Sequence, residues 1–374
     1  MESGGVGTMK SDTDDKLPSI ESNLLEAMAL EAVQIALGGN IKRGISLALN
    51  ARGRARAAQD ERAELAALSA ASRCHSMNND ALASFSSGID AQALAQKLGD
   101  QRSLGHALCS IASSAFVLRL LDASISVAER AIAEAVDLHD DDLESRARVI
   151  LGENLGDLQR FDEARLQLKL ALEAARRRGT AGLQNRAHAK LGTLAAKEAE
   201  YFAARDETSG VERACSVALQ CANEIILLAK EPQNSTLVIS MLGLRARVHE
   251  FRGEWVAARE ETAAALALAR QSAYLSPIPP WSLRLAALLI REGDFAGARS
   301  TLEEGLRTAE NLRPSFRIGE LCEALMQLEQ RTGETAAAAQ WQERVDDERR
   351  IFEVERERAS AILAAHDWRR PLRQ

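Results

Sequence analysis

The chain has 374 residues, of which 46% are hydrophobic, only 4% are aromatic and 27% are charged, and its formal net charge is −7 at pH 7. So few aromatic residues, in a sequence rich in Ala, Leu, Glu and Arg, disfavour an all-β sandwich or barrel and favour helices. The charge balance disfavours disorder throughout and wholesale nucleic-acid binding, and no apolar run approaches the roughly 20 residues of a membrane helix. We therefore expect an all-α protein with no nucleic-acid partner and no membrane partner.

The N-terminal segment, residues 1–22, is polar. It lacks the basic start and apolar core of a signal peptide, so we expect a disordered leader. Five cysteines are too few and too scattered for a disulfide framework in a chain of this length. They are Cys74, Cys109, Cys215, Cys221 and Cys322. The expectation is a reducing, cytoplasmic setting.

A repeat of about 40 residues, a length within the range of helical repeat units, runs through residues 23–340. The small residue that would open the second helix of each hairpin recurs at every fortieth position, apart from one longer interval. These positions are Gly44, Ser84, Ser124, Ala164, Ala204, Ala258, Ala298 and Ala338. A second, mostly small row lies twelve positions earlier, at Ala32, Ser72, Ala112, Gly152, Gly192, Ala246, Ala286 and Met326. Since antiparallel helices approach closely only where the facing side chains are small, the spacing predicts eight helical hairpins.

Turn signals agree with this period. Five positions before the opening small residue, the predicted turn holds Gly39, Asn79, Gly253, Gly293 and Gly333. Asp, Gly and Pro fall between the units, for example in residues 98–100, 140–142 and 277–280. Proline is tolerated at a helix start and not inside one, so these segments mark unit boundaries.

With its small-small-aromatic pattern, the chain resembles the tetratricopeptide repeat (TPR) family, best seen in residues 151–175 and 291–306. The resemblance covers about residues 24–345. It implies a right-handed α-solenoid in which the first helix of each hairpin lines a concave groove. The family's commonest unit has about 34 residues. The longer units of this chain are similar to those of bacterial regulatory proteins.

The one longer interval, from Ala204 to Ala258, adds fourteen positions to the fifth unit, near residues 205–220. Asp206 to Gly210 has the composition of a turn, and Val211 to Lys230 that of one long helix. Two interpretations remain open. The insertion is a tolerated surface extension, or it protrudes to contact a partner or a second subunit.

Residues 341–374 have the pattern of a charged C-terminal helix, over 341–367, and a short tail. Val345, Phe352 and Ala359 recur at every seventh position, but Glu348 and Glu355 occupy the alternate positions that a coiled coil would need to be apolar. We therefore expect this helix to cap the solenoid. The array followed by such a helix is also similar to the sensory region of bacterial diguanylate cyclases. No Gly-Gly-Asp-Glu-Phe signature occurs, so the chain is not expected to be the cyclase.

Catalytic motifs are absent from the sequence. There is no phosphate-binding GxxxxGK[ST] or GxGxxG motif in a strand-to-helix context, and His249-Glu250 lacks the second histidine of a zinc protease helix. The spacing of Cys215 and Cys221 is not that of metal ligands. We expect no enzymatic activity, no catalytic residue, no cofactor and no metal.

The inward positions of the first helices carry an excess of bases. If the small residue is position 8 of each unit, the inward positions are 2, 5, 6, 9, 12 and 13. In units four to seven they hold more bases than acids, opposite to the whole-chain balance. The candidate groove residues are Arg146, Arg186, Lys190, Lys197, Arg247, Arg284 and Arg291. A basic groove would suit an acidic peptide, a C-terminal carboxylate or another anionic ligand.

Two hypotheses of function remain. The first is a non-enzymatic interaction scaffold or regulatory adaptor that binds an acidic peptide segment or anionic ligand in its concave groove. The second is a signal-input module that relays ligand binding or dimer state through the helix at 341–367. A homodimer is compatible with either hypothesis. The chaperone-type carboxylate clamp of the TPR family is not expected, because only Arg186 and Lys190 come near its pattern and its Asn partners are missing.

Overall fold

The computed structural model describes residues 20–37, 39–78, 80–228, 235–272, 275–312 and 315–365. Within these residues it contains sixteen helices and no strand. The helices are α1 (Ile20–Leu37), α2 (Ile41–Ala57), α3 (Glu61–Met77), α4 (Ala81–Leu98), α5 (Gln101–Val117), α6 (Leu121–Asp137), α7 (Asp141–Asp157), α8 (Phe161–Arg178), α9 (Ala181–Ala203), α10 (Thr208–Leu228), α11 (Ser235–Phe251), α12 (Trp255–Gln271), α13 (Ile278–Glu292), α14 (Phe295–Leu312), α15 (Ser315–Thr332) and α16 (Thr335–Ala365). The predicted leader and short tail fall mostly outside the described residues, although α1 already begins at Ile20.

The helices pair into eight antiparallel hairpins, each odd-numbered helix with the even-numbered helix that follows. From α2 to α9 a new helix begins at every twentieth position, and α12, α14 and α16 begin at every fortieth. The all-α, TPR-like α-solenoid predicted from the repeat period is thus confirmed.

Most of the turns that the structure describes share one design, in which a left-handed residue is followed by the N-cap of the next helix. Gln59 has φ of +54°, and the carboxylate of Asp60 then accepts a hydrogen bond from the backbone N–H of Ala63 at 3.0 Å. Such a cap satisfies a backbone donor that the first turn of a helix leaves free. The carboxylates of Asp80, Asp100 and Asp140 accept the corresponding hydrogen bond at 3.0–3.1 Å. The predicted turn glycines Gly39, Gly253, Gly293 and Gly333 all have positive φ, while Asn79 lies outside the described residues.

The small residues mark the closest helix contacts, as the sequence predicts. A Cβ atom on Gly152 would lie 2.8 Å from Leu168 Cγ and 3.3 Å from the carbonyl oxygen of Ala164. Ala164 and Ala298, in α8 and α14, are both fully buried. The hairpins therefore close where both helices carry a small side chain.

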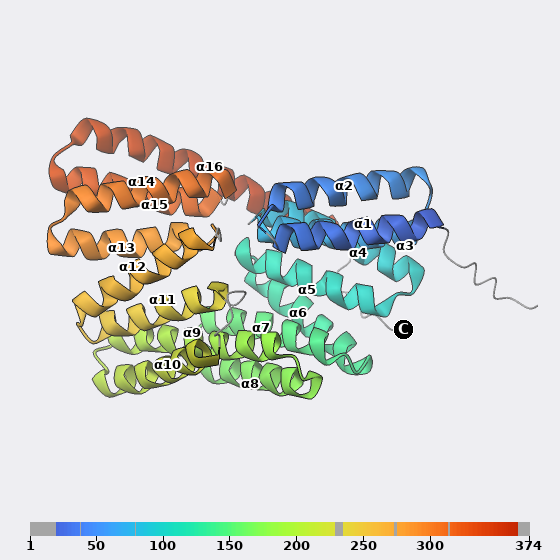
Figure 1. Cartoon of the computed structure of the whole chain (residues 1–374), viewed down its shortest axis with the longest axis horizontal. Helices are drawn as coiled ribbons and strands as arrows, with labels where there is room; N and C mark the ends of the chain where they lie inside the picture. The colour runs from blue at the N-terminus through green and yellow to red at the C-terminus, as the bar shows by residue number, and fades with distance from the viewer. Residues whose placement is uncertain are drawn as a thin grey trace, which may run out of the picture.

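Odd-numbered helices line the inner side of the curved array (Figure 1). Consecutive odd-numbered helices contact one another from α1 to α11 and again between α13 and α15. Among the described residues, consecutive even-numbered helices make at most marginal contact. Because the inner side of a curved stack is shorter, the odd-numbered helices form the concave face, as the TPR resemblance implies.

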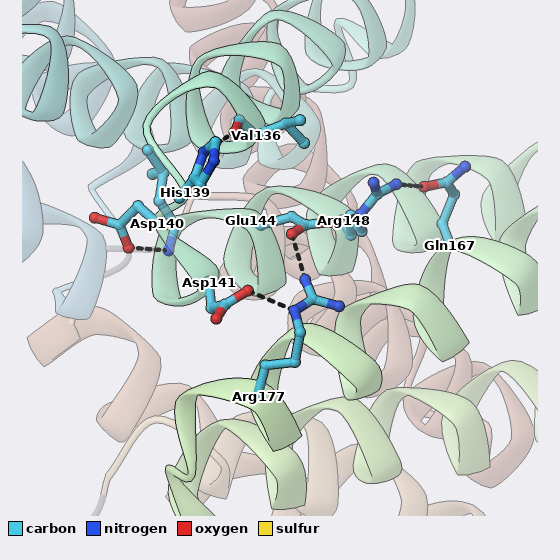
Figure 2. Close-up of polar contacts among 9 residues, drawn as sticks. Val136, His139, Asp140, Asp141, Glu144, Arg148, Gln167 and Arg177 are labelled. Atoms are coloured by element: carbon cyan, nitrogen blue, oxygen red, sulfur yellow. Dashed lines mark hydrogen bonds and ion pairs between the residues drawn. The ribbon is translucent and has the colours of Figure 1, made fainter.

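Charged residues tie neighbouring helices together at the unit boundaries, and Figure 2 shows one such boundary between α6, α7 and α8. The Asp140–Asp142 run does mark a boundary, since α7 begins at Asp141. Arg177, in the last turn of α8, donates hydrogen bonds to Asp141 Oδ1 at 2.8 Å and to Glu144 Oε2 at 2.7 Å. These two bonds hold the last turn of α8 against the first turn of α7.

The fifth hairpin is longer than the others, and here the structure corrects one alignment. Ala204 does not open a second helix, because α9 continues to Ala203 and α10 begins only at Thr208. Gly192 in α9 instead lies against α10 near Ala218 and Cys221. The extra residues are therefore divided between the end of α9, the start of α10 and the turn, and they lengthen both helices.

The C-terminal helix closes the array on itself. No break separates the eighth hairpin from the charged helix predicted at 341–367, because α16 runs unbroken from Thr335 to Ala365. Its far end contacts α4, and in Figure 1 the red α16 reaches the blue N-terminal helices. Ala359 and Leu363 are buried there in the same apolar core as Phe85 and Ile89 of α4. Besides covering the last unit, α16 thus joins the eighth hairpin to the second.

Candidate functional site

The seven candidate groove residues all lie on odd-numbered helices, which are the helices that line the concave side. Arg146 is on α7, Arg186, Lys190 and Lys197 are on α9, Arg247 is on α11, and Arg284 and Arg291 are on α13. The structure thus distributes them over four consecutive inner helices and does not gather them into one cluster.

Five of the seven are neutralised by carboxylates of the chain itself. Arg146 pairs with Asp142 on its own helix at 2.8 Å. The other four each reach an acid on the preceding inner helix: Lys190 pairs with Glu153, Lys197 with Asp157, Arg247 with Glu200, and Arg284 with Glu250, the last at 2.7 Å. The inward bases therefore also act as ties between successive hairpins.

Arg186 and Arg291 are different. Neither has a carboxylate within ion-pair distance among the described residues, and both side chains are exposed. The Arg291 guanidinium lies over the indole ring of Trp255, 3.6 Å from its centroid, which fixes the side chain without cancelling its charge. These two arginines are the members of the predicted set whose charge remains available to a ligand.

Three of the predicted residues share a cavity of about 590 Å³ between α11 and α13. Its polar lining includes Arg247, Arg284 and Arg291, together with Arg317 from α15 and the single acid Glu250. Its apolar lining includes Trp255, Trp281, Leu283 and Leu288. We call this space the groove cavity. Its size is in the range of small-ligand or side-chain pockets.

Two features of the sequence make room for the groove cavity. Trp281 follows the proline pair at 279–280 that starts α13, and its indole ring packs directly on the backbone of α11 at Gly243. A Cβ atom at Gly243 would overlap that ring. The absence of a side chain at Gly243 thus allows Trp281 to form one wall of the cavity.

Burial affects the charged groups in this region. Desolvation lowers the pKa of Arg284, and the ion pair with Glu250 opposes that shift. Because an arginine stays protonated in proteins, the consequence is a poorly hydrated cation whose interactions with an anion are strengthened.

Two titratable side chains of α5, His106 and Cys109, lie near Arg146 of α7. Burial, followed by the nearby charge of Arg146, lowers the pKa of His106. Burial also raises the pKa of Cys109 to about 12, against the opposing effects of Arg146 and Arg186. His106 is thus held neutral and Cys109 is held as a thiol, so neither adds a charge to those of the arginines.

Sequence reasoning missed Trp255, Trp281 and Arg317 as groove residues. Trp255 follows a turn glycine, and this position places it beside the next inner helix, where it contacts Arg291. Trp281 and Arg317 lie near the starts of inner helices. A proline pair followed by tryptophan at such a start was the one available signal.

The part of the chain that the structure describes holds neither a metal-binding cluster nor a disulfide. It contains no group of three His, Cys, Asp or Glu side chains placed to hold a metal ion. All five cysteines are free thiols, and four of them are buried. None of the described helices is both long enough and apolar enough to cross a membrane.

No family model and no curated protein match the sequence, whereas solved structures do. A Rap protein complexed with competence and sporulation factor is 12% identical, with a TM-score of 0.53, over 89% of this chain and 99% of that chain. The Rap conjugation gene regulator of the plasmid pLS20, in complex with the Phr* peptide, is 12% identical, with a TM-score of 0.57, over 89% and 96%. NprR in complex with its cognate peptide NprX is 12% identical, with a TM-score of 0.54, over 88% and 96%. At this identity the chain shares their TPR-like helical-repeat fold.

Proposed function

We propose that this protein is a cytoplasmic regulatory adaptor that binds an extended peptide with acidic side chains along its concave groove, without catalysing a reaction. The observation that carries the proposal is the groove cavity. There the Arg291 side chain, which has no carboxylate partner among the described residues, lies beside the indole rings of Trp255 and Trp281. Such a surface suits a peptide that offers an acidic and an apolar side chain together.

The charge argument depends on Arg186 and Arg291. Most inward bases already form ion pairs between successive hairpins, and these pairs largely neutralise their charge. Arg186 and Arg291 are exposed, lack a carboxylate partner among the described residues and lie on two different inner helices, α9 and α13. An extended ligand that crosses several hairpins is the kind of partner that meets both. Each contact is worth roughly 0–1 kcal/mol, so affinity must come from several contacts and from apolar burial.

Known proteins of this fold support the peptide part of the proposal. Of the three similar structures, one is described as a conjugation gene regulator, and two are described as complexes with a peptide. The contact of α16 with α4 adds a further reason. It closes the array, and a groove within a closed array favours a narrow, flexible ligand over a folded domain.

A set of labelled octapeptides tests the proposal by fluorescence anisotropy. Each peptide carries one Phe, and the flanking residues are acidic, neutral or basic. We expect the full-length protein to bind the acidic set, and the affinity to fall as salt rises from about 50 to about 500 mM, because screening acts on every charge contact. The double variant Arg186→Gln/Arg291→Gln should weaken binding roughly fivefold to tenfold without exposing an unpaired carboxylate.

Arg43→Gln/Arg178→Gln is the matched control, since these two exposed arginines lie on even-numbered helices and have no ion-pair partner among the described residues. Its binding should equal that of the parent. Equal binding of acidic and basic peptides, or an unchanged affinity in Arg186→Gln/Arg291→Gln, would exclude the groove as an acidic-peptide site.

A second candidate function is a signal-input module of the kind found in diguanylate cyclase sensory regions. The similar structures described above are not such regions, and the observation in favour is the docking of α16 on α4. A helix that joins the eighth hairpin to the second is placed to report a change in the curvature of the array. Affinity capture with the full chain and with a chain ending before residue 341 separates the two. Partners that survive the deletion indicate the groove, and partners lost with it indicate the helix.

A further inference from the structure

A second cavity, of about 540 Å³, lies where the regular repeat is interrupted. It is bounded by the first half of α8, the second half of α9 and the first half of α10, and we call it the hairpin cavity. It lies on the other side of α9 from the groove contacts, since Lys190 and Lys197 of α9 point to Glu153 and Asp157 of α7. It is therefore distinct from the groove cavity.

The lengthened fifth hairpin creates this space. The added turns of α9 and α10 extend past the start of α8, where a regular hairpin would already have ended. Aromatic contacts hold the extension in place: Tyr201 meets Phe161 edge-on at 5.3 Å and Phe202 at 5.7 Å. Gly210 lets the Phe202 ring pack against α10, because a Cβ atom there would lie 2.5 Å from the ring. The cavity thus has fixed walls.

Most of the inner wall is apolar. Leu194, Ala195 and Ala214 are buried residues that line it, and Phe202 and Val217 complete the wall nearer its opening. Val217 remains 49% exposed, so the cavity is open to solvent along α10. An apolar wall of this extent favours an alkyl or aryl group.

The charges at the opening are positive once internal pairs are subtracted. Arg165 pairs with Asp162 at 2.7 Å and also with Glu198, so the lining as a whole holds three bases against two acids. Lys169 and Arg213 line the same cavity from α8 and α10, and neither has an ion-pair partner among the residues that the structure describes. Two cations without an ion-pair partner among the described residues thus line this apolar space, one on α8 and one on α10.

We propose that the hairpin cavity binds a small amphipathic carboxylate, with its apolar chain against Leu194, Phe202 and Val217 and its carboxylate between Lys169 and Arg213. The apolar wall supplies most of the affinity, and the two cations select an anion over a neutral molecule of the same shape. This site is independent of peptide binding in the groove.

Isothermal titration of the full-length protein with decanoate tests the proposal, with decan-1-ol as the neutral probe of equal chain length. We expect saturable binding of one decanoate per chain and clearly weaker binding of decan-1-ol. Lys169→Gln/Arg213→Gln should lower decanoate affinity roughly fivefold to tenfold and leave decan-1-ol binding unchanged. Lys42→Gln/Arg307→Gln is its control, because those bases are also exposed and have no ion-pair partner in the described part of the chain, but lie on α2 and α14.

A steric variant tests the location. Val217→Trp places a large ring at the cavity opening from an exposed position, so the fold should persist, as a circular-dichroism melt would verify. Decanoate binding should then be lost. Leu227→Trp is the matched control on the same helix, since Leu227 is 68% exposed and does not line the cavity. Undetectable decanoate binding by the parent, equal affinity for decan-1-ol, or full binding by Val217→Trp would each overturn the proposal.

Discussion

Asn154 donates a hydrogen bond from Nδ2 to Ser124 Oγ at 2.9 Å, and one unit earlier Ser114 donates to Ser84 Oγ at the same distance. The separation along the chain is the same in both pairs. The acceptor is the small residue that opens a second helix, and the donor lies on the first helix of the next hairpin. Buried side chains thus connect successive units by a repeated polar contact, in addition to apolar packing.

Asn154→Ala should destabilise the array by about 1–3 kcal/mol, because it removes a buried hydrogen bond and leaves a small void. The side chain is fully buried, and its Nδ2 also bonds the carbonyl oxygen of Ile150 at 2.8 Å. The urea midpoint measures the effect. Asn50→Ala, on the exposed face of α2, is the control and should leave the midpoint unchanged.

Ala164→Trp should disrupt the fourth hairpin, because Ala164 is fully buried where α8 meets α7 at Gly152. Overpacking costs about 1–3 kcal/mol, and more where the backbone cannot move apart. A thermal melt compares it with Leu166→Trp, in which the substituted residue is 55% exposed on the same helix. Equal melting temperatures for the two variants would show that the hairpin contact is placed wrongly.

Gly243→Ala should displace the Trp281 ring from α11 and reshape the groove cavity. We expect a shift in tryptophan emission, because the indole leaves its packed position and gains water contact. Gly53→Ala is the control in α2, where an added Cβ atom meets no other atom within 4 Å. There the change should stabilise the helix by about 0.5–1 kcal/mol and leave the emission unaltered.

Leu363→Glu should detach the end of α16 from α4, since it places a charge where the leucine is only 6% exposed. Hydrogen exchange of the amides in residues 355–365 and in α4 should accelerate, while the middle units stay protected. Ile351→Glu, at a position 48% exposed on α16, should leave exchange at both sites as in the parent. Unchanged protection in Leu363→Glu would argue against the closed array.

Thiol reactivity should depend strongly on pH. Burial raises the pKa of Cys109 to about 12 and those of Cys221 and Cys322 to about 11. Since the thiolate is the nucleophile, iodoacetamide should label these residues slowly in the native chain near pH 8 and rapidly in urea, where the pKa returns to about 8.5. A thiol whose folded pKa is raised stabilises the fold below about pH 8.5, and that contribution is lost as pH rises through about 11. Native labelling as fast as in urea would contradict these shifts.

The sequence by itself determined the hairpins, because every signal for them is local. Small residues at Gly152 and Ala164, a left-handed turn position and an aspartate N-cap all act within a single repeat unit, so their period can be read without knowing how the units stack. The same locality explains the misplacement of Ala204. A period shows how many residues a unit gains, but not on which side of the turn they lie.

Tertiary structure alone decided which inward bases remain free. Sequence position predicts that Lys197 and Arg291 face the groove, but whether a carboxylate neutralises them depends on the rotation between one hairpin and the next. That rotation brings Asp157 to Lys197 and leaves Arg291, among the described residues, with only the ring of Trp255. The contact of α16 with α4 also depends on how the hairpins stack. It requires the summed curvature of the whole array, and no single repeat unit of the sequence encodes that curvature.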